Sequence, residues 1–220
     1  MVNLGNRNIL YKGKYLADYI KNNKLNKSVY SYSKEIFENF ESEKPNIKIS
    51  ILDEIIENKG KEIDHIVLFC SDQPDSTRKD QDTKYIGYII EKILKELLQE
   101  AIIESREIKC EITDNNKLLR FYKDFFREQL ENKPDEQYII CDSGGTAQQK
   151  SSLKIIAEFM LQEKQFEVNY IAFDGVKSIW KAVPQIEYRR IITSEQIRSL
   201  IKMGEYNGAL NIKSNFSSGE

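Results

Sequence analysis

The segment that most limits how this chain folds runs from Gln137 to Met160, where a short apolar stretch meets a glycine-rich turn. Tyr138 to Cys141 has the composition of a buried strand, and apolar residues recur at helical spacing from Ala147 onward. The turn between them reads Asp142-Ser143-Gly144-Gly145-Thr146. The first amides of a helix have no intrahelical acceptor and lie at the positive end of its dipole. Because two glycines let a ligand come close to the backbone, this segment predicts a phosphate-binding turn.

Two other interpretations of this turn have to be weighed. A Gly-Gly pair between a strand and a helix also occurs for tight packing alone. A P-loop of the form G-x-x-x-x-G-K-[ST] is disfavoured because Gln149 stands where the second glycine belongs. No clear acidic strand end elsewhere offers a magnesium ligand, so we do not expect an NTPase.

Strands and helices alternate along most of the chain. Amphipathic helices are expected over Thr83 to Leu98, capped by Asp82 or Thr83, and over Leu118 to Leu130. The expected strands are Val2 to Leu4, Ile63 to Cys70, Ile108 to Ile112, Tyr138 to Cys141 and Phe166 to Phe173, with a further strand near Tyr188 to Ile192. This alternation predicts an α/β domain, with one Rossmann-like parallel sheet and helices on both faces.

Polar clusters follow three of the expected strands. They consist of Gly5, Asn6, Arg7 and Asn8 after the first strand, Ser71, Asp72 and Gln73 after the second, and residues 143–150 after the fourth. Parallel sheets of this kind bind ligands outside the carboxyl ends of their strands, so the three clusters are expected to converge on one site. For the first cluster an ordinary hairpin turn is the alternative, because Gly-Asn is favourable turn chemistry.

Composition narrows the class of ligand. The 220 residues carry a net charge of only -2, so no global basic field exists to hold long nucleic acid. The three cysteines are far apart in apolar surroundings and are expected to be reduced, and neither a CxxC motif nor a Cys/His cluster indicates zinc. We therefore expect no metal site. Since no apolar run approaches 18 residues, we also expect no membrane segment and a cytoplasmic protein.

Taken together, these motifs resemble those of the CARF domain, the CRISPR-associated Rossmann-fold sensor of type III ancillary effectors, in its Csm6-like form. The resemblance rests on LGNRN near the N-terminus, SDQ after a strand, Asp82-Thr83 opening a helix and DSGGT-x-Q-x-K opening another. It covers about Val2 to Ile192, and the SGGT segment is its most specific part. The chain departs from the family at Ala147, where many relatives carry proline.

The resemblance implies a homodimer whose paired faces bind a cyclic oligoadenylate and switch an effector in antiviral defence. It assigns no cofactor besides this ligand. The ligand-binding residues it implies, together with the polar groups beside them, are Gly5, Asn6, Arg7, Asn8, Ser71, Asp72, Gln73, Ser143, Gly144, Gly145, Thr146, Gln148 and Lys150. Cyclic tetra-adenylate is the ring we expect, with hexa-adenylate open.

The domain division that we expect is a sensor domain over residues 1–192 and a connector helix and tail over residues 193–220, with the effector domain absent or removed. The alternative is a stand-alone ring nuclease that cleaves its ligand without metal, with Arg7 or Lys150 stabilising the charge on phosphate. A third hypothesis, a Rossmann-like enzyme acting on a dinucleotide, lacks G-x-G-x-x-G after any strand.

Overall fold

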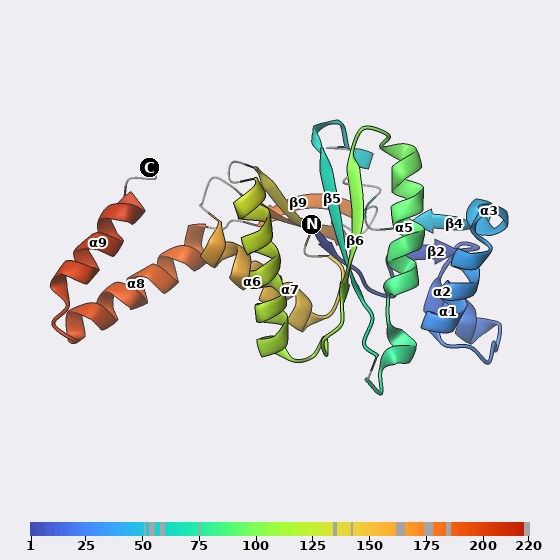
Figure 1. Ribbon diagram of the computed structural model, residues 1–220, viewed down its shortest axis with the longest axis horizontal. Coiled ribbons are helices and arrows are strands. Elements are labelled where there is room, and N and C mark those ends of the chain that lie inside the picture. The colour runs from blue at the N-terminus through green and yellow to red at the C-terminus, as the bar shows by residue number, and fades with distance from the viewer. Residues whose placement is uncertain are drawn as a thin grey trace.

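A six-stranded sheet forms the centre of the fold in the computed structural model of this chain (Figure 1). The structure describes residues 1–50, 52, 56–57, 60–74, 76–133, 136–141, 143–161, 166–173, 178–183 and 186–217. In spatial order the strands are β6 (Ile102–Ile108), β5 (His65–Ser71), β1 (Val2–Asn3), β7 (Tyr138–Cys141), β8 (Phe166–Phe173) and β9 (Ser178–Val183). All neighbours pair in parallel except β9, which runs antiparallel to β8.

The order of these strands identifies the point where the chain changes direction across the sheet. Counted along the chain within this sheet alone, the spatial order is 3-2-1-4-5-6, the order of doubly wound nucleotide-binding sheets. The chain builds outward from β1 through β5 to β6, then returns to place β7 on the other side of β1. The ends of β1 and β7 therefore flank the topological switch point, where such sheets hold their ligands.

Helices cover both faces of the sheet, as the sequence predicts. The helix α5 (Lys84–Leu97) lies on one face, and α6 (Asn115–Asn132) and α7 (Ala147–Met160) lie on the other (Figure 1). Successive side chains of β5 point to opposite faces of the sheet and so contribute to a hydrophobic core on each face. Leu68 packs with α5, whereas Phe69 packs with α6 and α7. The predicted Rossmann-like α/β fold is thus confirmed.

A small antiparallel sheet extends the core on the α5 side. It contains β3 (Lys14–Tyr15), β2 (Ile9–Tyr11) and β4 (Ile47–Ile49), with the helices α1 (Leu16–Asn22), α2 (Val29–Glu38) and α3 (Phe40–Glu43) beside it. The tight turn between β2 and β3 places Lys12 and Gly13 at φ of 49° and 78°, as a two-residue hairpin requires. Residues 5–8 do form a turn, in which the amide of Asn8 donates to the carbonyl of Gly5 at 3.2 Å. It is not a hairpin turn, because β1 and β2 belong to different sheets.

Two strand predictions are corrected. The strand expected at Ile108 to Ile112 lies earlier, at β6, where apolar Ile103 and Ile108 are buried at the sheet edge. The charged residues between them are half-buried and pair with side chains of β5, α5 and α6. The segment Tyr188 to Ile192 belongs to a helix, α8 (Ile186–Lys202), because β9 already occupies the edge beside β8.

The C-terminal part of the described chain is a helical hairpin of α8 and α9 (Tyr206–Ser217), which projects away from the sheet (Figure 1). The domain boundary expected at residue 192 falls inside α8, and the division itself stays a prediction. A search of the described residues finds no helix with the length and apolarity needed to span a membrane.

A buried hydrogen bond joins the central strand to α6 and generates a test of this packing. Tyr122 Oη donates to Asn3 Oδ1 at 2.6 Å, and both side chains are buried. We expect Tyr122→Phe to lower the free energy of unfolding by about 1–3 kcal/mol, because it leaves a buried acceptor without a donor. Urea denaturation measures this change. Tyr206→Phe, at an exposed tyrosine, is the matched control, and equal effects of the two substitutions would contradict the packing described.

Candidate functional site

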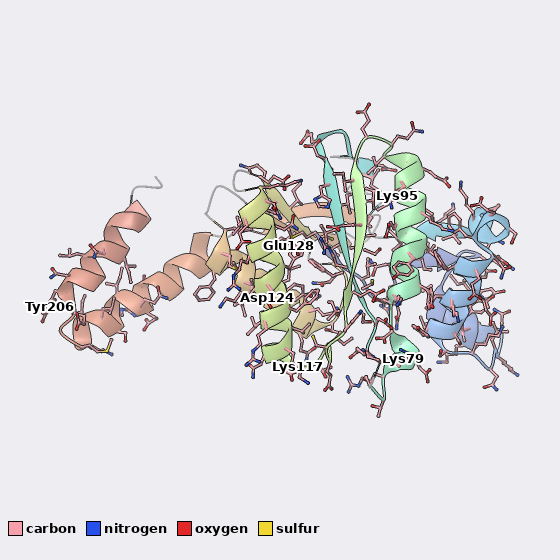
Figure 2. The ribbon with its side chains drawn as sticks, in the orientation of Figure 1. Lys79, Lys95, Lys117, Asp124, Glu128 and Tyr206 are labelled. Atoms are coloured by element: carbon pink, nitrogen blue, oxygen red, sulfur yellow. The ribbon has the colours of Figure 1, made fainter. Side chains whose placement is uncertain are left out.

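The three polar clusters lie at one edge of the sheet because β1 is paired on both sides by the strands that carry the other two. Val2 is in register with Leu68 of β5 and with Cys141 of β7. The loop after β1 therefore sits between the loop after β5 and the turn after β7, at the switch point. In Figure 2 the labelled Lys79 and Lys117 lie at this end of the molecule, and Lys95 lies at the other.

Glycines make the contact between the first loop and the turn possible. A Cβ on Gly144 would lie 1.9 Å from the carbonyl oxygen of Asn3, which no side chain can tolerate. Gly145 has φ of 78° and its amide nitrogen lies 3.2 Å from where a Cβ of Gly5 would stand. The turn after β7 is thus packed directly against the backbone that follows β1.

The start of α7 is fixed by a capping box. Thr146 Oγ1 accepts from the amide of Gln149 at 3.2 Å, and Gln149 Oε1 accepts from the amide of Thr146 at 2.8 Å. Thr146 Oγ1 also donates to the carbonyl of Ile112 at 3.3 Å, which ties the turn to the segment after β6. The amides of Ala147 and Gln148 lie in the first turn, where a helix provides no acceptor. The cap therefore sets the direction of α7 and leaves these two amides for a ligand.

The loop after β5 is held by the Asp82-Thr83 pair. The amide of Ser71 donates to Thr83 Oγ1, and the amide of Thr83 donates back to Ser71 Oγ, both at 3.0 Å. Asp82 accepts from the amide of Gln73 at 2.6 Å and from Gln73 Nε2 at 2.7 Å.

The role expected for Asp82 or Thr83 as a side-chain cap of α5 is corrected by this arrangement. Thr83 occupies the N-cap position, but its side chain makes no capping hydrogen bond to the helix. Gln73 Oε1 also accepts from the amide of Ile112 at 3.0 Å. Ser71 and Gln73 are thus buried and bonded within the protein, where they shape the loop.

Asp72 belongs to a charged network at the same edge. Its carboxylate lies 2.8 Å from Lys84 Nζ and 3.5 Å from Lys79 Nζ, and Lys84 also lies 2.9 Å from Glu107. Burial favours a higher pKa for Asp72, but the hydrogen bond and charge of Lys84 outweigh it and hold the pKa below its ordinary value. The negative charge of Asp72 is therefore neutralised locally, so the edge can accept an anion.

Two cations at this edge have no acidic partner in the described part of the chain. Arg7 is exposed, with its guanidinium 5.7 Å from the centre of the Tyr15 ring, and Lys150 is half-buried in the first turn of α7. Gln148 and Asn6 are half-buried beside them in the chain. The arrangement offers fixed positive charge, free amides and side-chain amides at one place, which is the chemistry of a phosphate and nucleobase site.

Buried amide groups gather under the two turns. Asn8 Oδ1 accepts from the amide of Gly5 at 2.5 Å, which closes the first turn. The side-chain NH2 groups of Asn3, Asn8 and Gln149 are buried and have no acceptor among the residues that the structure describes. Unpaired buried donors cost free energy. All three of these donors lie under the turns at the switch point.

The structure brings together all three predicted clusters, but it divides them by exposure. Arg7, Asn6, Ser143, Gln148 and Lys150 are at least partly accessible, whereas Asn8, Ser71 and Gln73 are buried. Asp142 lies outside the described residues. Whether each residue binds a ligand stays a prediction.

Sequence reasoning missed Asn3 and the role of Gln149. The spacing Thr146-x-x-Gln149 is itself a capping-box signal and could have revealed the latter. No cluster of three metal-ligating side chains occurs in the described part of the chain.

The fold and the geometry of the site define this chain as a doubly wound α/β domain with a candidate anion site at its switch point. No family model matches the sequence, and no curated protein matches it. Among solved structures, the fold is similar to that of Enterococcus italicus Csm6 bound to cyclic hexa-2'-fluoro-hexa-dAMP, with a TM-score of 0.56 and 14% sequence identity. The similarity covers 74% of this chain and 44% of the Csm6 chain, so this chain corresponds to less than half of that protein. At this identity the likeness establishes the fold, which is the one implied by the resemblance to CARF domains.

The contact at Gly144 generates a direct test. Gly144→Ala would place a methyl group against the Asn3 carbonyl, so we expect the turn to shift or the domain to lose at least about 2 kcal/mol of stability. Gly208→Ala in α9, where the nearest atoms stand 3.5 Å away, is the matched control and should be neutral or stabilising. Thermal denaturation of both variants measures the difference, and a fully stable Gly144→Ala protein would contradict the contact.

Proposed function

We propose that this chain binds a cyclic oligoadenylate at the carboxyl edge of its sheet and acts as the sensor domain of a type III CRISPR antiviral effector. The observation that carries the proposal is the meeting of Gly5 with the Gly144–Gly145 turn at the switch point, beside the open first turn of α7. The likeness to Csm6 supports it, because that protein is bound to a ring of six adenosine-type nucleotides in the solved structure.

The residues at this edge match the chemistry of such a ring. A phosphodiester is an anion that accepts hydrogen bonds, and the free amides of Ala147 and Gln148 at the positive end of α7 are donors for it. Arg7 and Lys150 add charge without competing acidic partners among the described residues. The side-chain amide of Gln148 suits adenine edges and ribose hydroxyl groups, which both donate and accept. Asn6 offers only its amide nitrogen, because its Oδ1 atom is buried.

A ring with four or six phosphates needs more than one copy of this surface. One chain offers a single Arg7, a single Lys150 and a single α7 N-terminus. A two-fold homodimer would present each of them twice around a symmetric ring. We propose such a dimer in the cytoplasm, with cyclic tetra-adenylate as the preferred ring and the hexa-adenylate ring as the competing one. The bound dimer would regulate an effector that is attached or supplied by a partner.

The same contacts could serve a ring nuclease. In that reaction a ribose 2′-oxygen attacks the adjacent phosphorus, the 5′-oxygen of the next nucleotide leaves, and the product ends in a 2′,3′-cyclic phosphate. Arg7 or Lys150 would stabilise the charge that develops on phosphate. Sensor and nuclease differ only in the fate of the ring, so the test must follow both binding and cleavage.

This test uses labelled cyclic tri-, tetra- and hexa-adenylate, each incubated with the protein. A native gel follows binding of the ring, and a denaturing gel follows its cleavage. We expect one ring to shift and stay intact, and we expect Lys150→Ala or Arg7→Ala to weaken binding by about tenfold or more, because each removes a charged donor to phosphate. Lys95→Ala, the same change at the opposite edge, is the control (Figure 2).

Three other results would change or overturn the proposal. A shift followed by linear products would establish the ring nuclease. Binding of every ring with equal affinity in wild type and Lys150→Ala would place the ligand elsewhere. Absence of binding to all three rings would overturn the proposed function.

A further inference from the structure

A cavity of about 730 Å³ lies at the amino edge of the sheet, at the opposite end of the strands from the candidate oligoadenylate site. The start of β5 at His65, the start of β7 at Tyr138 and the first residues of the chain line it, and α6 contributes Gln129. Cavities of this size are typical of small-molecule sites. Nothing in the proposed function uses it.

Its lining is mixed, with apolar residues beside charged and polar ones, and two of the polar residues, Gln129 and Tyr138, are buried. Val67 and Cys141 belong to the apolar part, and both are buried. The hydroxyl of Tyr138 is buried and has no hydrogen-bond partner in the described chain, and the residue is only 6% exposed. Gln129 is 8% exposed, and no hydrogen bond from its side chain joins another described residue. The Tyr138 hydroxyl is closed off even from water, whereas the Gln129 amide is reachable and has no partner in the described chain. Because largely buried polar groups normally find partners, Gln129 points to a ligand that supplies one.

The charged lining of the cavity is acidic. Glu62 and Asp64 are exposed at its mouth with no ion pair in the described residues, and Glu136 pairs with Lys133 at 2.6 Å. No lysine or arginine occurs among the described lining residues. The amino group of Met1 donates to the carbonyl of Ile139 at 2.6 Å, and burial lowers its pKa to about 6, so it is mostly neutral at pH 7.5. This electrostatic environment repels anions and attracts cations.

We propose that the amino-edge cavity binds a small organic cation, an amine with an aromatic or aliphatic body. The ammonium group would lie at the mouth between Glu62 and Asp64, and the body would pack on the apolar wall and the ring of Tyr138. Gln129 would hydrogen-bond a polar atom on the body. The proposal is independent of oligoadenylate binding, since a polyphosphate ring is excluded from an acidic cavity.

Calorimetric titration with tryptamine and with its neutral counterpart, tryptophol, tests this site. We expect saturable binding of tryptamine and weaker binding of tryptophol. Replacing both mouth carboxylates in Glu62→Gln/Asp64→Asn should weaken tryptamine binding by about fivefold or more. Asp124→Asn/Glu128→Gln, which makes the same charge change on the exposed side of α6, is the matched control and should bind as wild type (Figure 2).

A second variant probes Gln129. Gln129→Leu should reduce tryptamine affinity while leaving the thermal stability equal or higher, because it removes an amide that has no partner in the described chain. Three results would overturn the proposal. The first is that neither tryptamine nor spermidine binds saturably up to roughly 10 mM. The others are that tryptophol binds as tightly as tryptamine, and that the Glu62→Gln/Asp64→Asn variant binds tryptamine as tightly as wild type.

Discussion

The close approach between the backbone after β1 and the turn after β7 is the constraint on which the candidate site depends. The carbonyl of Asn3 occupies the space where a side chain at Gly144 would be, and Gly5 lies against the amide of Gly145. These contacts exist because β1 is short and sits between β5 and β7, so its loop emerges directly at the switch point. Once the turn is fixed there, the capping box between Thr146 and Gln149 directs α7 and presents its first amides outward.

The remaining loops support this centre in different ways. The Ser71–Thr83 and Gln73–Asp82 hydrogen bonds clamp the loop after β5 onto the start of α5, and Ile112 connects the segment after β6 to both Gln73 and Thr146. The edge is therefore a set of mutually bonded loops. Arg7 and Lys150, which have no acidic partner among the described residues, are exposed and half-buried, respectively. The neutralised acid, Asp72, is held by Lys84. Because these donors are held in place beforehand, the proposed binding of an anion would require little rearrangement of the edge.

Sequence patterns predicted the parts of the fold that are set by local periodicity. The strand–turn–helix of residues 138–160, the long helix α5 and the aromatic helix α6 were all recognisable, because their apolar residues follow one period over many positions. Edge elements were harder to place. Strand β6 carries four polar residues in a row, Glu104 to Glu107, between its isoleucines and lies at a sheet edge. The prediction therefore fell on the more apolar stretch after it.

Part of the site also followed from the sequence. Convergence of the three clusters required only parallel strands that end at one edge. The division into exposed and buried members could not be predicted from the sequence. Ser71 and Gln73 bond to Thr83 and Asp82, which lie twelve and nine residues further along the chain. The amino-edge cavity was invisible to sequence reasoning, because Tyr138 and Gln129 come from separate elements and meet only in the folded domain.

Hydrogen–deuterium exchange with and without cyclic tetra- or hexa-adenylate would test the central claim most directly. The account predicts slower exchange in peptides that cover residues 143–150 and 5–8, because the ligand would occupy the first amides of α7 and the loop against them. Peptides covering residues 62–67 and 136–139 at the amino edge should be unchanged. Protection confined to the amino edge, or binding that leaves residues 143–150 unprotected, would contradict the account.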